Sequence, residues 1–525
     1  MIVADFRKNK DMSTFNTFAK ESTTKLNRAG GEAFALTPEL ELYTTVVTAS
    51  LSNKFYETAS ERIDRIASLV GRCDAHFVAQ LAVYARQKMN LRSVPLLLVV
   101  ELAKVHSGDD LVSRTVEKVI MRADEIMELL SCYQWRNKNN ISGTGGNTPK
   151  KLGKLSHQIQ VGLQRAFNKF DEYQFAKYDR DGLEVKLRDA LFLVHPKAKD
   201  ETQQALFDKI VNRTLETPYT WETELSALGQ KVFGSEAAKK DSFAAKWEEL
   251  IESGKLGYMA MLRNLRNFLL FDISRDKIKD VADRLSDEYE VYCSKQFPFR
   301  FLSAYKELKP IANGKTTILL DALEKAVLAS AQNIDGFDEN SRVLIACDVS
   351  GSMRSPICRN SSVENYDVGL VLAMLLKNRC ENVVSGLFGD TWKVINLPSS
   401  GILSNVDALY AQAGSVGYST NGFKVIEYLR TNNIIMDKVM MFTDCQMWNS
   451  YGTGQTIRKE WDEYKKIAPN AKLYLFDLAG YGAVPLDIVR EDVYLIAGWS
   501  DRIFEILTAI ENGSSAIEMI RKTEI

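Results

Sequence analysis

Residues 344–353 read LIACDVSGSM, and this stretch decides how the second half of the chain is expected to fold. Its apolar residues predict a buried strand. The strand ends at Asp348, which is followed by the hydroxyls of Ser350 and Ser352 on either side of a glycine. A carboxylate and two hydroxyls in this place allow three interpretations, which are a nucleophile, a metal site or an ordinary turn.

The sequence around this stretch alternates between strands and helices. Apolar runs predict strands at 342–348, 382–390, 392–397, 438–445, 472–478 and 492–498. Helices are expected near 364–380, 421–431, 456–467 and 501–511. This alternation predicts a mostly parallel, doubly wound sheet. Ligands bind such sheets at the carboxyl ends of the strands, so Asp348 lies where a site is expected.

Up to about residue 335 the chain shows helical periodicity instead. The segment 75–90 places Phe77, Leu81 and Tyr84 on one helical face, and Thr37 before Pro38 marks another helix start. Further amphipathic segments are expected near 59–72, 93–106, 109–131, 184–194, 200–214, 241–253, 257–271, 274–292 and 315–333. Many short helices in succession predict stacked helical repeats with a curved surface for extended partners. The predicted fold is therefore α plus α/β, with domains at 1–338 and 339–525.

Composition and cysteine usage indicate an ordinary globular protein. The chain has 525 residues, of which 45% are hydrophobic and 26% are charged. No apolar run approaches the ~18 residues of a membrane span, and no secretory signal is recognisable at the N-terminus. The seven cysteines form no C-x-x-C pair, which favours reduced thiols in a cytoplasm over disulfides or a zinc site.

Positive charge is concentrated in one window, although the net charge of the chain is only −1. Residues 131–170 contain no Asp or Glu and hold Arg136, Lys138, Lys150, Lys151, Lys154, Arg165 and Lys169. Charge alone does not separate a nucleic-acid surface from a solvated loop and helix face. The Gly/Asn/Thr loop within this window does not match the phosphate-loop pattern G-x-x-x-x-G-K-[ST].

The nucleophile interpretation of the Asp348 stretch is the weakest. A serine nucleophile needs a base, usually His, and all four histidines precede residue 200. An aspartyl nucleophile at Asp348 stays open by this argument, although Ser350 stands where a second carboxylate would help to hold magnesium.

Oxygen-bearing side chains at three places in the predicted sheet favour a metal site. Asp348, Ser350 and Ser352 alternate along one loop, Thr420 precedes a helix, and Asp444 follows a strand. Magnesium prefers oxygen ligands in near-octahedral geometry. The set therefore predicts a divalent cation site, with Mg²⁺ as the expected ion. The alternative is a group of turn residues that bind no metal.

The pattern D-x-S-x-S, followed by Thr420 and by T-D after a strand, resembles the metal-ion-dependent adhesion site (MIDAS) of von Willebrand factor A domains. The resemblance implies that Ser350, Ser352 and Thr420 are hydroxyl ligands, while Asp348 and Asp444 coordinate directly or through water. Such sites often leave one position for an acidic residue of a partner protein. Asn421 departs from the pattern, because an acidic residue is expected there in close relatives.

Four passages of the helical half share a pattern with a second known family. They are YARQKMNLRSVPLLLVVELA (84–103), FAKYDRDGLEVKLRDALFLVHPKAKD (175–200), TPYTWETELS (217–226) and GYMAMLRNLRNFL (257–269). They resemble the TROVE module of the Ro ribonucleoprotein family, and the order of helical module and A domain matches its bacterial or phage-type members. The resemblance implies a ring of HEAT-like helical repeats that the A domain closes.

The resemblance also implies RNA ligands and the residues that contact them. Lys177 and His195 match RNA-contacting residues, and Arg180 lies close to a third. The basic window adds Lys138, Lys150 and Lys151, and the other matching passages add Arg86, Arg92, Arg263 and Arg266, which could line a central hole. Tyr84, Tyr133, Trp135 and Tyr178 interleave with basic residues, either as stacking surfaces for bases or as core residues.

The sequence therefore predicts a cytoplasmic RNA-binding protein that is not an enzyme. By resemblance, it binds small noncoding Y-like RNA on an outer basic surface and single-stranded ends of misfolded or damaged RNA in the central hole, acting in RNA quality control or as a ribonucleoprotein scaffold. Expected protein partners are an exoribonuclease such as polynucleotide phosphorylase and an acidic residue docked at the cation, and no membrane is involved. Two other classes stay open, a metal-dependent protein adaptor without RNA and an aspartyl phosphotransferase that uses Asp348.

Overall fold

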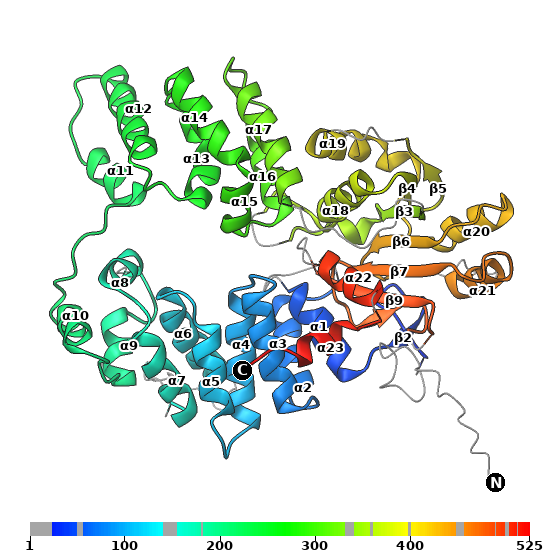
Figure 1. The fold of residues 1–525 in the computed structure, drawn as a ribbon, viewed down its shortest axis with the longest axis horizontal. Coiled ribbons are helices and arrows are strands. Elements are labelled where there is room, and N and C mark those ends of the chain that lie inside the picture. The colour runs from blue at the N-terminus through cyan, green and yellow to red at the C-terminus, as the bar shows by residue number, and fades with distance from the viewer. Residues whose placement is uncertain are drawn as a thin grey trace, which may run out of the picture.

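The computed structural model describes residues 24–49, 56–139, 155–179, 182–330, 341–357, 361–396, 401–447, 456–488, 490–498, 503–511 and 513–525. Helices stack in two arms that lie one above the other in Figure 1. The first arm comprises α1 (Pro38–Val47), α2 (Ala59–Val70), α3 (Ala75–Gln87), α4 (Ser93–Val105), α5 (Leu111–Val119), α6 (Asp124–Asn139), α7 (His157–Phe167), α8 (Glu172–Tyr178), α9 (Leu187–Val194) and α10 (Glu201–Asn212). The second comprises α11 (Trp221–Gly229), α12 (Glu236–Glu252), α13 (Tyr258–Leu270), α14 (Arg275–Ser286), α15 (Glu288–Ser294), α16 (Pro298–Leu308) and α17 (Thr316–Ala329).

Local capping sets the ends of these helices and corrects two predictions. The segments 109–131 and 274–292 were each expected as one helix, and each is two. Asp287 has an extended backbone that ends α14, and its side chain accepts the Glu290 N–H to start α15. Between α5 and α6, the Glu125 carboxylate accepts the backbone N–H groups of Met121 and Arg122. At both places a polar side chain accepts hydrogen bonds from free N–H groups and starts a new helix, although hydrophobic periodicity alone predicts one continuous helix.

The C-terminal half forms the predicted doubly wound sheet. Its strands are β3 (Arg342–Asp348), β4 (Asn382–Phe388), β5 (Trp392–Val394), β6 (Lys438–Thr443), β7 (Lys472–Asp477) and β9 (Val493–Ala497), in the order β5-β4-β3-β6-β7-β9. All neighbours are parallel except β5, which pairs antiparallel with β4. The accompanying helices are α18 (Asn365–Arg379), α19 (Ile402–Gln412), α20 (Phe423–Thr431), α21 (Ile457–Ile467), α22 (Ile503–Glu511) and α23 (Ala516–Arg521). Because β3 and β6 are parallel neighbours, their carboxyl ends lie side by side.

The two halves are joined at both ends of the helical arc. α16 packs against α18 and α17 against α19, while α1 packs against β9 and α3 against α23 (Figure 1). The sheet domain thus closes the arc into a ring, as the resemblance to the helical-repeat family implied. Buried apolar residues of both halves belong to one hydrophobic cluster that includes Phe34 and Ile520. No helix in the described part of the chain is both long and apolar enough to cross a membrane.

A short hairpin also crosses between the halves, although the sequence predicted no strand in the helical half. β1 (Thr24–Leu26) pairs with β2 (Glu32–Ala35), and β2 pairs antiparallel with β8 (Ala483–Val484). Strands of two to four residues leave no alternation pattern long enough to be recognised in the sequence. The helical half and the sheet half therefore share a small sheet as well as a core.

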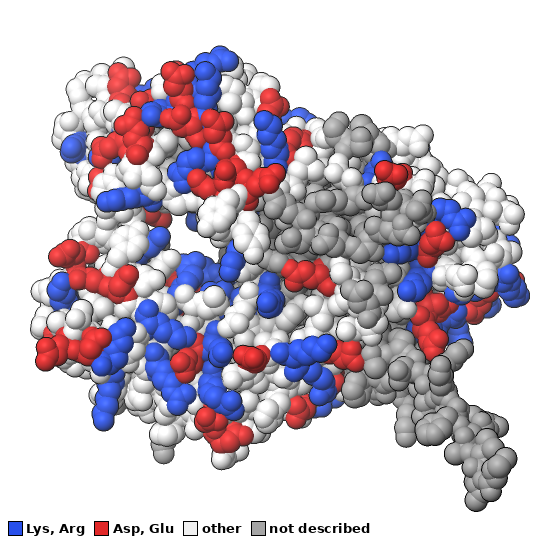
Figure 2. Space-filling view, in the orientation of Figure 1, with Lys and Arg blue, Asp and Glu red and all other residues white. Residues whose placement is uncertain are grey.

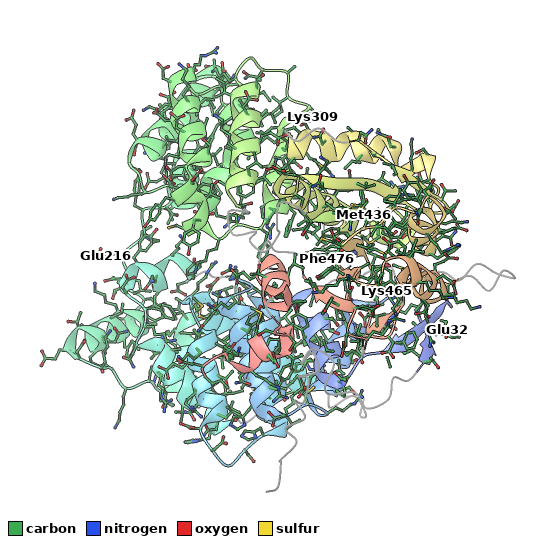
Figure 3. All side chains as sticks on the ribbon, turned by 45° about the vertical axis from the view of Figure 1, so that its right-hand side comes forward. Glu32, Glu216, Lys309, Met436, Lys465 and Phe476 are labelled. Atoms are coloured by element: carbon green, nitrogen blue, oxygen red, sulfur yellow. The ribbon has the colours of Figure 1, made fainter. Side chains whose placement is uncertain are left out.

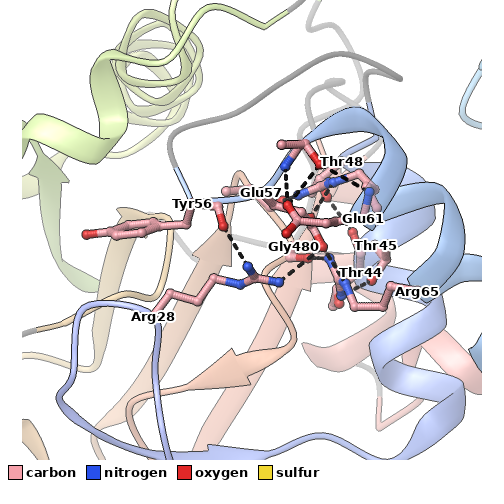
Figure 4. A network of polar contacts seen from close by, with 12 residues as sticks. Arg28, Thr44, Thr45, Thr48, Tyr56, Glu57, Glu61, Arg65 and Gly480 are labelled. Atoms are coloured by element: carbon pink, nitrogen blue, oxygen red, sulfur yellow. Dashed lines mark hydrogen bonds and ion pairs between the residues drawn. The ribbon is translucent and has the colours of Figure 1, made fainter.

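A buried carboxylate holds the helical half to the sheet domain (Figure 4). Glu57 accepts from Arg62 Nε at 2.7 Å and Arg65 Nε at 2.8 Å, and Arg28 contacts it at 3.2 Å. Arg62 Nη2 and Arg65 Nη2 donate at 2.7 Å to the carbonyls of Ala479 and Gly480, respectively, in the loop after β7. Burial alone would raise the pKa of Glu57, but the hydrogen bond from Arg65 and the charges of the arginines outweigh it and hold the pKa below its usual value.

Gly480 is the glycine that this junction requires. Its φ is +64°, and a Cβ on it would lie 2.2 Å from Thr48 Oγ1 and 2.6 Å from the carbonyl oxygen of Thr44. Both the left-handed backbone and the close approach of α1 exclude a side chain. The loop after β7 can therefore reach Arg65 only because residue 480 is glycine.

Candidate functional site

The predicted cation ligands meet at the carboxyl ends of β3 and β6. Asp348, Ser350, Ser352, Thr420 and Asp444 are all buried, with exposed fractions from 0% to 7%. The hydroxyls of Ser350 and Ser352 lie 3.3 Å apart. The N–H of Gly351 donates to the carbonyl of Tyr418 at 3.1 Å, which ties the first ligand loop to the loop that carries Thr420. The parallel sheet thus brings together residues that are far apart in sequence.

Hydrogen bonds hold both carboxylates of this group in place. Asp348 Oδ1 accepts the N–H of Ser350 at 2.8 Å, and its Oδ2 accepts the hydroxyl of Thr443 at 2.7 Å. Asp444 Oδ1 accepts the N–H of Gln446 at 3.0 Å. Supporting bonds of this kind orient metal ligands before the metal arrives.

The electrostatics of the site favour a cation. Burial raises the pKa of Asp348 well above its usual value, and the negative charge of Asp444 raises it further, while hydrogen bonds from Ser350 and Thr443 oppose both effects. Two buried carboxylates with three hydroxyls form an all-oxygen donor set, which suits Mg²⁺. The described residues contain no cluster of three or more His, Cys, Asp or Glu side chains that could hold a metal elsewhere. The residues present therefore fit the ion that the sequence predicted.

Asn421 supports the Thr420 loop. Its side-chain amide donates to the carbonyl of Asp390 at 3.1 Å, and its backbone N–H donates to Gly389 at 2.9 Å. Asp390 also accepts the N–H of Ser419 at 2.8 Å. Asn421, at the position where the resemblance leads us to expect an acidic residue, thus anchors the ligand loop to the turn after β4.

We expect Mg²⁺ to raise the melting temperature more at about pH 7.5 than at about pH 5.5. Because the pKa of Asp348 is raised in the fold, the proton on this group stabilises the metal-free protein at low pH, and this contribution is lost as the pH rises through the folded pKa. A cation replaces the proton where it has been lost. Thermal melts with and without Mg²⁺ at the two pH values measure the difference, and Asp348→Asn should remove it. An equal gain at both pH values would contradict the expectation.

The helical half supplies two residues at this site that the sequence did not indicate. Arg28 and Tyr56 line the same cleft, of about 450 Å³, as Ser350, Ser352 and Thr420. The N–H of Arg28 donates to Gln446 Oε1 at 2.7 Å, and its guanidinium donates to the carbonyl of Tyr56 at 2.6 Å. Burial and the charge of Asp444 raise the pKa of Tyr56, and a hydrogen bond with Ser352 opposes them. Arg28 and Tyr56 lie outside any recognisable motif, so no sequence signal could have linked them to the cation ligands.

A second hollow, of about 730 Å³, opens where α8 and α9 face the segment that links α10 to α11. Its basic lining residues are Lys177, Lys186, Arg188 and Arg213. Glu216 lies beside the space between the two arms (Figure 3). Within the described part of the chain, neither Lys177, Arg188 nor Arg213 forms an ion pair with a carboxylate. This basic cleft can therefore offer cations to an anionic ligand.

The other residues predicted for RNA are placed as follows. His195 is exposed and ends α9 with a left-handed φ of 50°, at the opposite end of that helix from Arg188. Lys150, Lys151 and Arg180 lie outside the described residues, and so does the side chain of Lys138 at the end of α6. Of the predicted contacts, the structure thus places Lys177 in the basic cleft, while His195 is not among the residues that line it.

The arginines expected at the central hole differ in their surroundings. Arg86 is buried and pairs with Glu125 at 2.8 Å, so it joins α3 to α6 and the expectation for it needs correction. Arg92 pairs with Asp124 at 2.8 Å and Glu128 at 3.2 Å.

Arg266 pairs with Glu307 at 3.5 Å across an exposed surface, and Arg263 is exposed on α13. Among the aromatic candidates, Tyr84 and Tyr133 are core residues, while Trp135 is exposed and Tyr178 is partly buried.

Comparisons with known proteins support the predicted relationship. A family model described as TROVE domain matches residues 212–317. Telomerase protein component 1 is 25% identical in Mus musculus and 24% identical in Rattus norvegicus, each over 351 residues that cover 51% of this chain and 13% of the relative. The chain thus matches only about an eighth of the length of these relatives.

The crystal structure of the Deinococcus radiodurans RO (RSR) protein matches with a TM-score of 0.57 and 18% identity, over 91% of this chain and 100% of that chain. This similarity shows a shared fold of helical module and sheet domain. Together with the TROVE match, it confirms the resemblance to the Ro family that the sequence indicated.

Proposed function

Because the chain matches the TROVE model and shares its fold with a Ro protein, we propose that it binds RNA. The observation that carries this proposal is the basic cleft, where Lys177, Arg188 and Arg213 present positive charge and form no ion pair with a carboxylate in the described part of the chain. Lysine and arginine contacts to phosphates supply affinity with little sequence preference. The proposed ligand of this cleft is a small noncoding, Y-like RNA.

The opening between the two arms is the proposed entry for single-stranded ends of misfolded or damaged RNA. Figure 2 shows this opening, with Lys and Arg side chains gathered on the lower arm beside it. The protein would act by binding, in RNA quality control or as a ribonucleoprotein scaffold in the cytoplasm, and would not catalyse a reaction. An exoribonuclease such as polynucleotide phosphorylase is the proposed partner that the bound RNA tethers.

The cation site is proposed to dock a protein. Asp348, Ser350, Ser352, Thr420 and Asp444 would hold Mg²⁺, which would offer an open position to a carboxylate of the partner. The completeness of this donor set also favours a second candidate function, a metal-dependent protein adaptor without RNA.

Crosslinking of the protein to RNA in cells, followed by sequencing of the recovered RNA, tests the proposal. Enrichment of small noncoding RNA over a control with uncrosslinked cells is the expected result. Recovery of no RNA above that background would leave the adaptor function as the better explanation.

The double variant Lys177→Ala with Arg188→Ala should weaken RNA binding and flatten its salt dependence. Binding releases fewer counterions when two phosphate contacts are lost. The magnitude of the slope of log K against log salt concentration should therefore fall by about 1.4 to 1.8. Fluorescence anisotropy titrations over a range of salt concentrations measure this slope. The matched control is Lys239→Ala with Lys279→Ala, which removes the same charge from surface positions on α12 and α14. An unchanged slope in the first variant would place the phosphate contacts elsewhere.

A further inference from the structure

We propose that the basic cleft holds an unpaired, single-stranded segment of RNA whose bases stack on Tyr173 and Phe192. This inference rests on the proposed RNA binding and names the form of RNA that the cleft accepts. It is carried by the aromatic side chains beside the cations of the cleft.

The first aromatic side chain lies on α8. Tyr173 and Lys177 are four residues apart and therefore share one face of the helix. Lys177 Nζ lies 5.8 Å from the centre of the Tyr173 ring, and this ring is 47% exposed. The N-terminal capping box of Asp171 and Gln174 fixes the helix that carries both residues. A cation of the cleft thus lies beside an exposed ring on a rigid element.

α9 repeats the same arrangement. Arg188 and Phe192 are again four residues apart, and Arg188 Cζ lies 5.4 Å from the centre of the Phe192 ring. Phe192 is 45% exposed although it has no polar group to place in water. Two successive helices therefore each present an exposed ring next to a cation. Neither cation forms an ion pair with any residue that the structure describes. Stacking bases would cover the apolar rings while the neighbouring cations bind phosphates.

The alternation of rings and cations continues from Lys177 to another hollow, separate from the basic cleft. Lys177 Nζ also lies 5.8 Å from the ring of Tyr178, and Arg122 Cζ lies 4.7 Å from the same ring. Tyr178 and Arg122 line a hollow of about 450 Å³ between α4, α6 and α8. Rings and cations thus follow one another over a path longer than a single nucleotide site, which suits a strand.

The chemistry of the cleft favours unpaired bases over a duplex. In an RNA duplex the base faces are covered by their neighbours, so exposed rings contribute only where bases are splayed out. Asp179, Glu216 and Glu222 also line the cleft and would repel a dense row of phosphates. Carboxylates can instead accept hydrogen bonds from base amino groups. The cations and carboxylates that line the cleft, together with the rings that lie beside two of these cations, therefore match a nucleotide with an accessible base.

Binding of a short fluorescent oligouridine and of a blunt RNA duplex tests the inference. In Tyr173→Ala with Phe192→Ala, affinity for the single strand should fall by about 5- to 150-fold per ring that stacks. The salt dependence should stay unchanged because no charge is removed. Tyr173→Phe, which keeps the ring, should bind as the unaltered protein does. A strand with a purine analogue whose emission is quenched by stacking should lose that quenching in the double variant.

The matched control removes two other exposed tyrosines, in Tyr289→Ala with Tyr292→Ala. These side chains are 75% and 56% exposed on α15, away from the basic cleft, and their loss should not change binding. If the unaltered protein binds neither RNA, the proposed function itself fails. If it binds RNA but the Tyr173 and Phe192 variant keeps full affinity and full quenching, only the stacking inference is overturned. Melting curves of all variants check the fold, and Tyr173→Leu with Phe192→Leu, which keeps most of the apolar area, replaces any alanine variant that does not fold.

Discussion

Replacing Glu57 with alanine should lower the free energy of unfolding by about 3–5 kcal/mol. The side chains of Glu57 and Arg62 are 0% and 1% exposed, so the substitution leaves the Arg62 guanidinium buried without its counter-charge. It also removes the acceptor that Arg65 and Arg28 share. Urea denaturation followed by circular dichroism measures the loss.

An exposed ion pair provides the control for this result. Glu463→Ala breaks the contact with Lys466, in which both side chains are more than half exposed, and should cost at most about 1 kcal/mol. Equal losses for the two variants would mean that the Glu57 network does not hold the halves together more firmly than a surface pair. Glu57→Gln should lie between them, because it keeps hydrogen-bond acceptance at one oxygen and loses the charge.

Asp348→Ala should abolish Mg²⁺ binding while RNA binding stays nearly unchanged. The variant removes a carboxylate at the centre of the donor set, and the hydroxyl of Thr443 loses its acceptor. The proposed RNA contacts lie on α8 and α9, which share no residue with the cleft around Ser350. Isothermal titration with Mg²⁺ and anisotropy with RNA measure the two activities separately.

The control for this variant is Glu381→Ala, which removes an exposed carboxylate just before β4 and should alter neither activity. Retained Mg²⁺ binding in Asp348→Ala would contradict the assigned site. Loss of RNA binding together with the metal would show instead that the cation stabilises the ring or contacts RNA directly.

The grouping of Asp348 and Asp444 could be predicted because it follows from local pattern and sheet topology. β3 and β6 appear in the sequence as apolar runs, and parallel neighbours must bring Asp348 and Asp444 to the same edge. The same reasoning could not find Tyr56, Arg28 or the pairing of β2 with β8. These contacts join segments that are distant in sequence and too short to leave a periodic signal.

Side-chain partners limited the prediction of the RNA surface. In the sequence, Arg86 and Lys177 are both basic residues of helical passages, and only the structure shows that Glu125 neutralises the first. Exposure is similarly unreadable, because Phe192 has the periodicity of a core residue and yet is exposed. Most helices could be predicted from periodicity, although α8, α11 and α16 were not. The free charges and exposed rings depend instead on which neighbour the fold supplies.

The position of α23 has a consequence for how the protein is made. Residues Ala516, Ile517 and Ile520 of this helix are buried. Gln80 of α3 also donates to the carbonyl of Arg521 at 2.6 Å, and these two residues are 441 positions apart in sequence. Ribosomes synthesise the chain from its N-terminus, so the surface of α3 that contacts α23 stays exposed until α23 has been translated. During that time the apolar surface is open to aggregation and to chaperones. A chain that stops short of α23 would keep that surface exposed, which would mark it for degradation.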